Sequence, residues 1–166
     1  MYATYAPQMY RLCHSLVGNS EDAKDSLQLA FVQAFRSIHR FDHTSQISTW
    51  LHGIVVRVAA NQRRSKRRWW RLRVAYDSDK RHLGKTRRPG PEARIAGREL
   101  LGLLDGALDK LPEKKRTAFI LYYVQQHSIQ EVANLTDASL QTTRARILSA
   151  RDKLQKLCRQ QHWEEP

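Results

Sequence analysis

Apolar residues recur at three- and four-residue spacing along much of the chain, and this spacing predicts amphipathic α-helices. The first three predicted helices cover residues 5–17, 20–38 and 48–63. Gly18 and Asn19 separate the first two, because both residues tolerate the left-handed conformation that ends helices. We expect the apolar stripe of the second helix to be buried. Its members are Ala23, Leu27, Ala30, Phe31, Ala34, Phe35 and Ile38.

Three further helices are predicted over residues 112–124, 128–135 and 139–154. Pro112 suits a first helical turn, where its missing N–H costs nothing. Ser128 and Glu131 have the spacing of a capping box, and Ser139 can cap the last helix. The apolar stripe of that helix is Leu140, Thr143, Ile147, Ala150 and Leu154. Its opposite face is Gln141, Thr142, Ala145, Arg146, Ser149 and Lys153.

The last two helices and the short turn 136–138 form a helix-turn-helix pattern. A helix with one apolar stripe and an exposed face of short polar and arginine side chains suits the major groove of DNA. Long cations reach phosphates, and short side chains let the backbone approach the bases. The alternative is an amphipathic helical hairpin with a solvated basic face.

Between the two sets of helices, residues 65–97 lack a regular pattern. Arginines and lysines alternate there with Trp69, Trp70 and Tyr76, and glycines and prolines follow. This composition indicates a linker with a helical start, since no segment alternates as a strand does. The predicted fold is all-α. It has two small helical domains, a three- or four-helix domain over residues 1–68 and a helix-turn-helix domain over 99–160, joined by a flexible basic linker over 69–98.

Charge favours a polyanionic partner. The 166 residues include 29 Lys and Arg against 16 Asp and Glu, for a net charge of +13. Residues 57–94 alone hold 14 Lys and Arg against 3 Asp and Glu. A positive charge of this size binds nucleic acid strongly and loses affinity as salt rises.

Other classes of protein lack support. Cys13 and Cys158 have neither CxxC spacing nor histidine pairs nearby, so we expect no disulfide framework and no metal site. The seven histidines lack partners at triad or ligand spacing, and no glycine-rich phosphate loop is present, so we expect neither catalysis nor a cofactor. With no long apolar run and no signal-peptide pattern, the chain reads as cytoplasmic, without membrane insertion.

Over most of its length the chain resembles the bacterial RNA polymerase sigma factors of the extracytoplasmic-function (ECF) type. Residues 5–42 resemble that family's polymerase-binding and promoter-melting module, and 47–68 its basic promoter-facing helix. Residues 111–123, 128–135 and 142–154 match its upstream-element module without a gap. The matching positions are Gly18, Asn19, Ala23, Asp25, Gln28, Phe31, Phe41, Trp50, Leu51, Leu111, Pro112, Glu113, Arg116, Glu131, Ala133, Thr142, Arg146, Ala150 and Arg151.

The resemblance implies three binding surfaces. Core RNA polymerase, through its largest catalytic subunits, would contact Asp25, Gln28, Leu29 and Val32. The downstream promoter element would contact His43, Thr44, Ser45, Gln46, Arg57, Asn61, Arg63 and Arg64. The upstream element would contact Gln141, Thr142, Arg144, Ala145, Arg146, Leu148, Ser149 and Arg151. An anti-sigma factor is a further implied partner.

Several positions depart from the family pattern. Leu29 stands where an acidic residue is usual, which implies weaker polymerase binding or compensation by phosphorylation, worth about −2 in charge. The candidate hydroxyls for that modification are Ser26, Ser48 and Thr49. Asp137 replaces a turn glycine and Gln141 replaces the glycine that opens the recognition helix. Because Asp tolerates the left-handed region, we expect the turn to survive.

The aromatic residues have two kinds of role. Trp50 has helical spacing with Leu51 and Ile54, so we expect it to anchor the core rather than to stack on a base. For Trp69 and Trp70, stacking on unpaired bases and packing against protein remain open.

Two other functions compete with the sigma factor. A stand-alone helix-turn-helix regulator explains the second domain and the charge, but leaves the matching positions of the first domain without a role. An RNA- or membrane-binding basic protein would use residues 57–94 alone and leave the helix-turn-helix unexplained.

Overall fold

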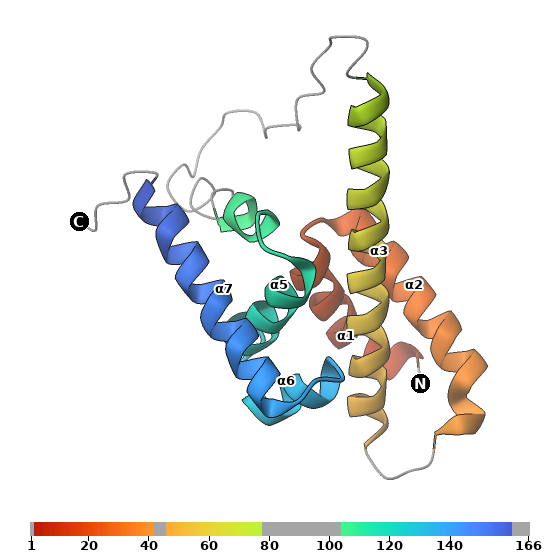
Figure 1. Cartoon of the computed structure of the whole chain (residues 1–166). Coiled ribbons are helices and arrows are strands. Elements are labelled where there is room, and N and C mark those ends of the chain that lie inside the picture. Colours follow the sequence, from red (N-terminus) through yellow and green to blue (C-terminus); the bar gives the residue numbers. More distant parts are fainter. Residues whose placement is uncertain (1, 42–45, 78–103, 161–166) are drawn as a thin grey trace, which may run out of the picture.

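The computed structural model describes residues 2–41, 46–77 and 104–160, and the regular structure in these ranges is helical. Figure 1 shows the arrangement. The elements are α1 (Tyr2–Val17), α2 (Ser20–Ser37), the 3-10 turn η1 (Ile38–Arg40), α3 (Ile47–Asp77), α5 (Glu113–Phe119), the π-helical turn η2 (Ile120–Val124), α6 (Ile129–Leu135) and α7 (Leu140–Gln160). Residues 104–109 are also helical. The all-α prediction is confirmed.

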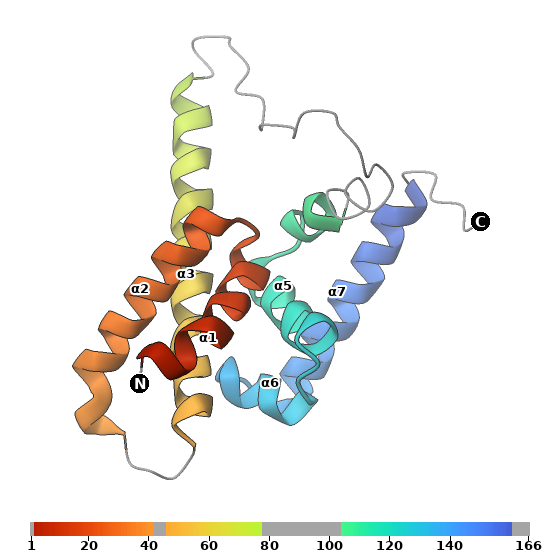
Figure 2. The ribbon, with the colours of Figure 1, turned by 180° about the vertical axis from the view of Figure 1, so that it is seen from behind.

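The first helical unit consists of α1, α2 and α3, which pack on one another along their apolar stripes. Gly18 links α1 to α2 with a φ of +88°, a conformation that glycine adopts without strain. Asn19 then caps α2, because its Oδ1 accepts a hydrogen bond from the backbone N–H of Asp22 at 2.9 Å. In Figure 2, α1 and α3 lie nearer to the C-terminal helices and α2 lies on the far side.

The predicted stripe of α2 is buried over most of its length, but its C-terminal end is not. Ala23, Leu27, Ala30 and Ala34 are buried, whereas Phe35 is 77% exposed and Ile38 is 39% exposed. The prediction for these last two residues is wrong. Phe35 lies at the edge of the stripe, on the side of the helix that carries the exposed Gln28 and Val32, and Ile38 lies in the 3-10 turn after α2 has ended. Trp50 packs against the core with Phe41 beside it, ring centroids 5.3 Å apart, as expected of an anchor.

Helix α3 is 31 residues long and continues well past Ser65, where the sequence pattern predicts the loss of order. The reason is local, since residues 65–77 contain neither glycine nor proline and are rich in residues of good helix propensity. The end of α3 therefore projects beyond α1 and α2 (Figure 1). The rest of the predicted linker lies outside the described residues.

The second helical unit consists of residues 104–160. Ser128 and Glu131 form the predicted capping box, and the hydrogen bond from the Ser128 backbone N–H lowers the pKa of Glu131. Asp137 adopts a φ of +49°, so the turn before α7 survives without glycine. The stripe of α7 is buried at Thr143, Ile147, Ala150 and Leu154, whereas Leu140 is 41% exposed, against the prediction.

The cores of the two units are continuous. One cluster of buried residues joins α1, α2 and α3 to Ala118, Ile120, Leu121, Val132, Leu135 and Ile147 of the second unit. A smaller cluster joins residues 107–111 to Ala150 and Leu154 of α7. The two helical units are therefore packed against each other in this structure.

Candidate protein and nucleic-acid interfaces

The predicted polymerase-binding residues lie together on the outer face of α2. Asp25, Gln28, Leu29 and Val32 are all exposed, and their spacing places them on one side of the helix. Leu29 and Val32 are each 46% exposed, and Phe35 extends the same face by one turn. Exposed apolar side chains grouped in this way are typical of surfaces that bind another protein. The sequence does not predict Phe35 on this face, because the spacing of Phe35 also fits the buried stripe.

Phosphorylation is restricted by the packing of this region. The side chain of Ser26 is fully buried and donates a hydrogen bond to the amide oxygen of Gln62 on α3. A kinase has no access to a hydroxyl in that position, so Ser26 is not a compensating site in this arrangement. Ser48 is half-buried and Thr49 is exposed at the start of α3.

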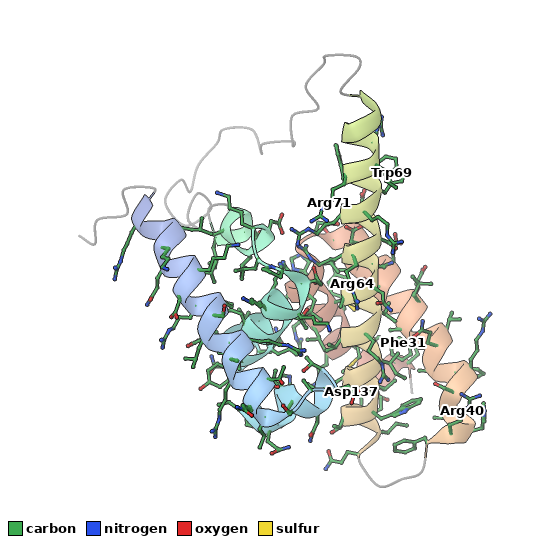
Figure 3. All side chains as sticks on the ribbon, viewed as in Figure 1. Phe31, Arg40, Arg64, Trp69, Arg71 and Asp137 are labelled. Carbon is green, nitrogen blue, oxygen red and sulfur yellow. The ribbon has the colours of Figure 1, made fainter. Side chains whose placement is uncertain are left out.

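The predicted downstream-element residues divide into two groups on α3. Arg57, Asn61 and Arg64 are exposed and lie on one face, where an Arg64 Nη2–H donates to the Asn61 side-chain oxygen at 2.9 Å. Gln46 is exposed just before the helix. Figure 3 shows Arg64 midway along α3, with Trp69 and Arg71 further toward its end. His43, Thr44 and Ser45 lie outside the described residues.

Arg63 faces the other way and contacts the second unit. Its guanidinium donates to Glu113 at 3.2 Å, to Asp109 at 2.8 Å and to the backbone oxygen of Val17 at 3.2 Å. Its side chain is 13% exposed. In the packed arrangement this group is already satisfied by protein, so the predicted contact of Arg63 with DNA requires the two units to separate.

The predicted recognition helix presents most of its site residues to solvent. Gln141, Thr142, Arg144, Ala145, Leu148 and Arg151 of α7 are exposed, and Arg146 and Ser149 are half-buried. Ser149 accepts a hydrogen bond from Lys115 of α5 at 2.6 Å. Ser139 caps the helix through the backbone N–H of Thr142, at 3.2 Å. The exposed face therefore combines short side chains with arginines, which suits contact with a DNA groove.

Arg116 is a second contact between the units. Its side chain on α5 is buried and donates to the backbone oxygen of Leu16, in the last turn of α1. Burial, and then the like charge of Arg63, lower the pKa of Arg116 to about 10, so it stays charged at neutral pH. Arg116 and Arg63 thus satisfy two carbonyl groups at the C-terminal end of α1, where the helix dipole favours cations.

Other kinds of chemistry have little support in the described residues. Within residues 2–41, 46–77 and 104–160, no three His, Cys, Asp or Glu side chains come together as a metal site requires. Burial raises the pKa of the Cys13 thiol to about 12, which leaves it a poor nucleophile. None of the helices in the described part of the chain is both long and apolar enough to cross a membrane.

Comparison with protein families matches residues 1–69 to sigma-70 region 2 and residues 101–154 to sigma-70 region 4. The matched segments contain the face of α2 described above and the helix-turn-helix. In this order, the two regions define the sigma-70 class of transcription initiation factors.

A similar protein indicates to which type of sigma-70 factor the chain belongs. The chain is 30% identical over 159 residues to the ECF RNA polymerase sigma factor SigW of Bacillus subtilis, over 93% of this chain and 85% of SigW. The chain belongs to the ECF sigma factors of the sigma-70 family.

Solved structures share the fold. The sigma factor RpoE of Bartonella quintana, in complex with the anti-sigma factor NepR, has a TM-score of 0.63 at 23% identity, over 95% of this chain and 94% of RpoE. CnrH, in complex with the cytosolic domain of CnrY, has a TM-score of 0.62 at 22% identity, over 94% of this chain and 83% of CnrH.

Proposed function

We propose that this sigma factor binds core RNA polymerase through the outer face of α2 and promoter DNA through the exposed faces of α3 and α7. In this division, residues 1–68 bind the polymerase and the downstream element, 69–98 link the two domains, and 99–160 bind the upstream element. The factor acts in the cytoplasm and performs no catalysis of its own. It supplies promoter specificity and local opening of the strands.

The observation that carries the proposal is the grouping of Asp25, Gln28, Leu29 and Val32 on an exposed face. A stand-alone DNA-binding regulator has no need for such a surface, whereas a sigma factor requires it. The absence of an acid at position 29 leaves Asp25 as the carboxylate of this face, and the apolar side chains of Leu29, Val32 and Phe35 supply burial instead.

Promoter binding requires a rearrangement of the packed units. Arg57 and Arg64 on α3 and Arg146 on α7 line the same cavity between the units. Arg57 and Arg64 remain exposed, but Arg63 is 13% exposed and pairs with Asp109 and Glu113 of the second unit, so its predicted contact with DNA needs the units to move apart. We therefore propose that the units separate when the factor binds polymerase and DNA.

Control by another protein is consistent with this arrangement. RpoE of Bartonella quintana is solved with the anti-sigma factor NepR bound. We propose that an anti-sigma factor controls this chain as well, by covering the surfaces that polymerase and DNA use.

Co-elution with bacterial core RNA polymerase on gel filtration tests the polymerase contact. We expect the wild-type chain to co-elute and Asp25→Arg to lose co-elution, because the substitution reverses the charge of the α2 face. The matched control is Asp152→Arg, which makes the same charge change at an exposed position on α7.

The result discriminates between the two candidate functions. The α2 face is exposed while the units are packed together, so packing does not explain a failure to bind. Absence of co-elution for the wild-type chain, or equal loss for both variants, would favour the stand-alone regulator.

A further inference from the structure

A small cavity lies between the two helical units. Its volume is about 130 Å³, and its walls come from α3, from α5, from the end of α6 and the turn after it, and from Arg146 of α7. The lining residues are Val56, Arg57, Ala60, Arg64, Glu113, Lys114, Thr117, Leu135, Thr136, Asp137 and Arg146. Of these lining residues, Figure 3 labels Arg64 on α3 and Asp137 in the turn before α7.

Four cations surround this cavity. Arg57 and Arg64 come from α3, Lys114 from α5 and Arg146 from α7. The ion pairs found in the described part of the chain include none of the four. Among the described residues, Arg64 donates to two neutral groups, the Ala60 backbone oxygen at 3.3 Å and the Asn61 side-chain oxygen at 2.9 Å.

The two carboxylates of the lining neutralise only part of this charge. Glu113 already pairs with Arg63, at 3.2 Å, and Arg63 lies outside the lining. Asp137 lies in the turn and is exposed, as are Arg57, Arg64 and Lys114, so it offsets one of the four positive charges. The balance in the cavity is therefore positive, and its walls are partly apolar, through Val56, Ala60 and Leu135. Like charges held together near low-dielectric walls attract a counter-anion more strongly than scattered surface cations do.

The chemistry of the cations indicates which anion fits. A guanidinium group binds two phosphate oxygens at once through two parallel N–H donors, and a lysine ammonium adds a compact positive charge. The volume is well below the roughly 300–1,000 Å³ of pockets that enclose drug-sized ligands. One or two phosphoryl groups fit a space of this size, whereas a nucleoside does not.

We propose that the cavity between the helical units is a binding site for a diphosphate group, held by Arg57, Arg64, Lys114 and Arg146. Because the four cations belong to both units, an anion that bridges them stabilises the packed arrangement. On the proposed function, it also occupies three arginines needed for promoter DNA, so diphosphate and DNA compete.

Isothermal titration calorimetry of the full-length chain with sodium pyrophosphate tests this site, at constant ionic strength and without DNA or polymerase. We expect binding to the wild-type chain and an affinity at least tenfold weaker for both Arg64→Gln and Arg146→Gln. The matched control is Arg144→Gln, since Arg144 is exposed on α7 but does not line the cavity. Its affinity should stay within twofold of wild type.

A second titration with ADP distinguishes two sources of the diphosphate group. Binding of both ligands indicates that a nucleotide inserts its phosphates and leaves its base outside, and binding of pyrophosphate alone indicates the free anion; either supports the site. Circular dichroism checks that each variant folds. If Arg146→Gln does not fold, Arg64→Gln still tests the site, because Arg64 lies at an exposed helix position.

Two results would overturn the proposal. The first is no binding of pyrophosphate at millimolar concentration. The second is an equal loss for Arg144→Gln and for the cavity variants, which would mean attraction to net charge alone. Since neither polymerase nor DNA is present, the outcome is independent of the co-elution experiment.

Discussion

The buried guanidinium of Arg116 contacts the end of α1 and so joins the second helical unit to the first. It donates to the backbone oxygen of Leu16, and Asp109 lies 3.9 Å from its Nε. Within the described residues that Nε has no hydrogen-bond partner. A buried charge that is only partly paired costs desolvation energy, and this cost offsets part of the stability that its hydrogen bond and packing contribute.

Replacement of Arg116 tests its role in stability. We expect Arg116→Ala to lower the free energy of unfolding by about 3 kcal/mol, because a cavity opens and Leu16 loses its donor. Urea denaturation measures this change. The exposed Arg144→Ala should alter the free energy by less than about 0.5 kcal/mol. Equal effects of the two substitutions would show that the Arg116 contact is absent in solution.

At the scale of elements, the spacing of apolar residues predicts which segments are helical. It does not predict where a helix ends, or which residues stay exposed, when helix propensity or the position of neighbouring helices determines these. The capping box of α6 and the buried stripes of α2 and α7 follow from local sequence. The length of α3 does not, because its last turns have no apolar stripe and depend on propensity alone. Phe35 and Leu140 fall on predicted stripes but lie where no neighbouring helix covers them.

Two arginines of α7 are expected to make different kinds of contact with DNA. Arg144 is exposed where base edges would be read, so Arg144→Ala should lose discrimination at one position by about 1–3 kcal/mol. Arg146 is half-buried and suited to phosphate, so Arg146→Ala should weaken binding to all sequences.

Affinities for matched and scrambled promoters, measured at one salt concentration, separate the two effects. If both variants behaved alike on both DNAs, the assigned recognition face would be wrong.

At the scale of the whole molecule, the packed units meet through residues without any periodic signal. Arg63, Arg116 and Gln125 make contacts across the units, and no spacing in the sequence pairs them. The sequence therefore predicts two domains but not how they meet. His52 and His127 also meet there, with ring centroids 5.8 Å apart.

Acid should loosen this contact. Burial lowers the pKa of His127; Glu131 opposes this shift and His52 adds to it. A base whose folded pKa lies below its unfolded value binds more protons when unfolded or released, so stability falls as pH drops through the usual histidine range. Around the pair, Gln8 and the Ser48 backbone oxygen contact His52.

Small-angle X-ray scattering measures the response. Between pH 7.5 and 5.5, at constant salt, we expect the radius of gyration to rise by a few ångströms from the roughly 15 Å of a compact chain of this length. His127→Gln should flatten the response. An equal rise in the variant would assign the transition to other groups.

The unbroken α3 has a mechanical consequence. Thirty-one residues at 1.5 Å each give a rod of about 46 Å. Its first half, up to Ala59, lies in the shared core, and the exposed Trp69 and Trp70 lie in the second half. The part after Ala59 is about 27 Å long, so a tilt of about 10° there moves the end of the helix by about 5 Å. Any force on the two tryptophans is therefore transmitted through one continuous helix to the core that the two units share.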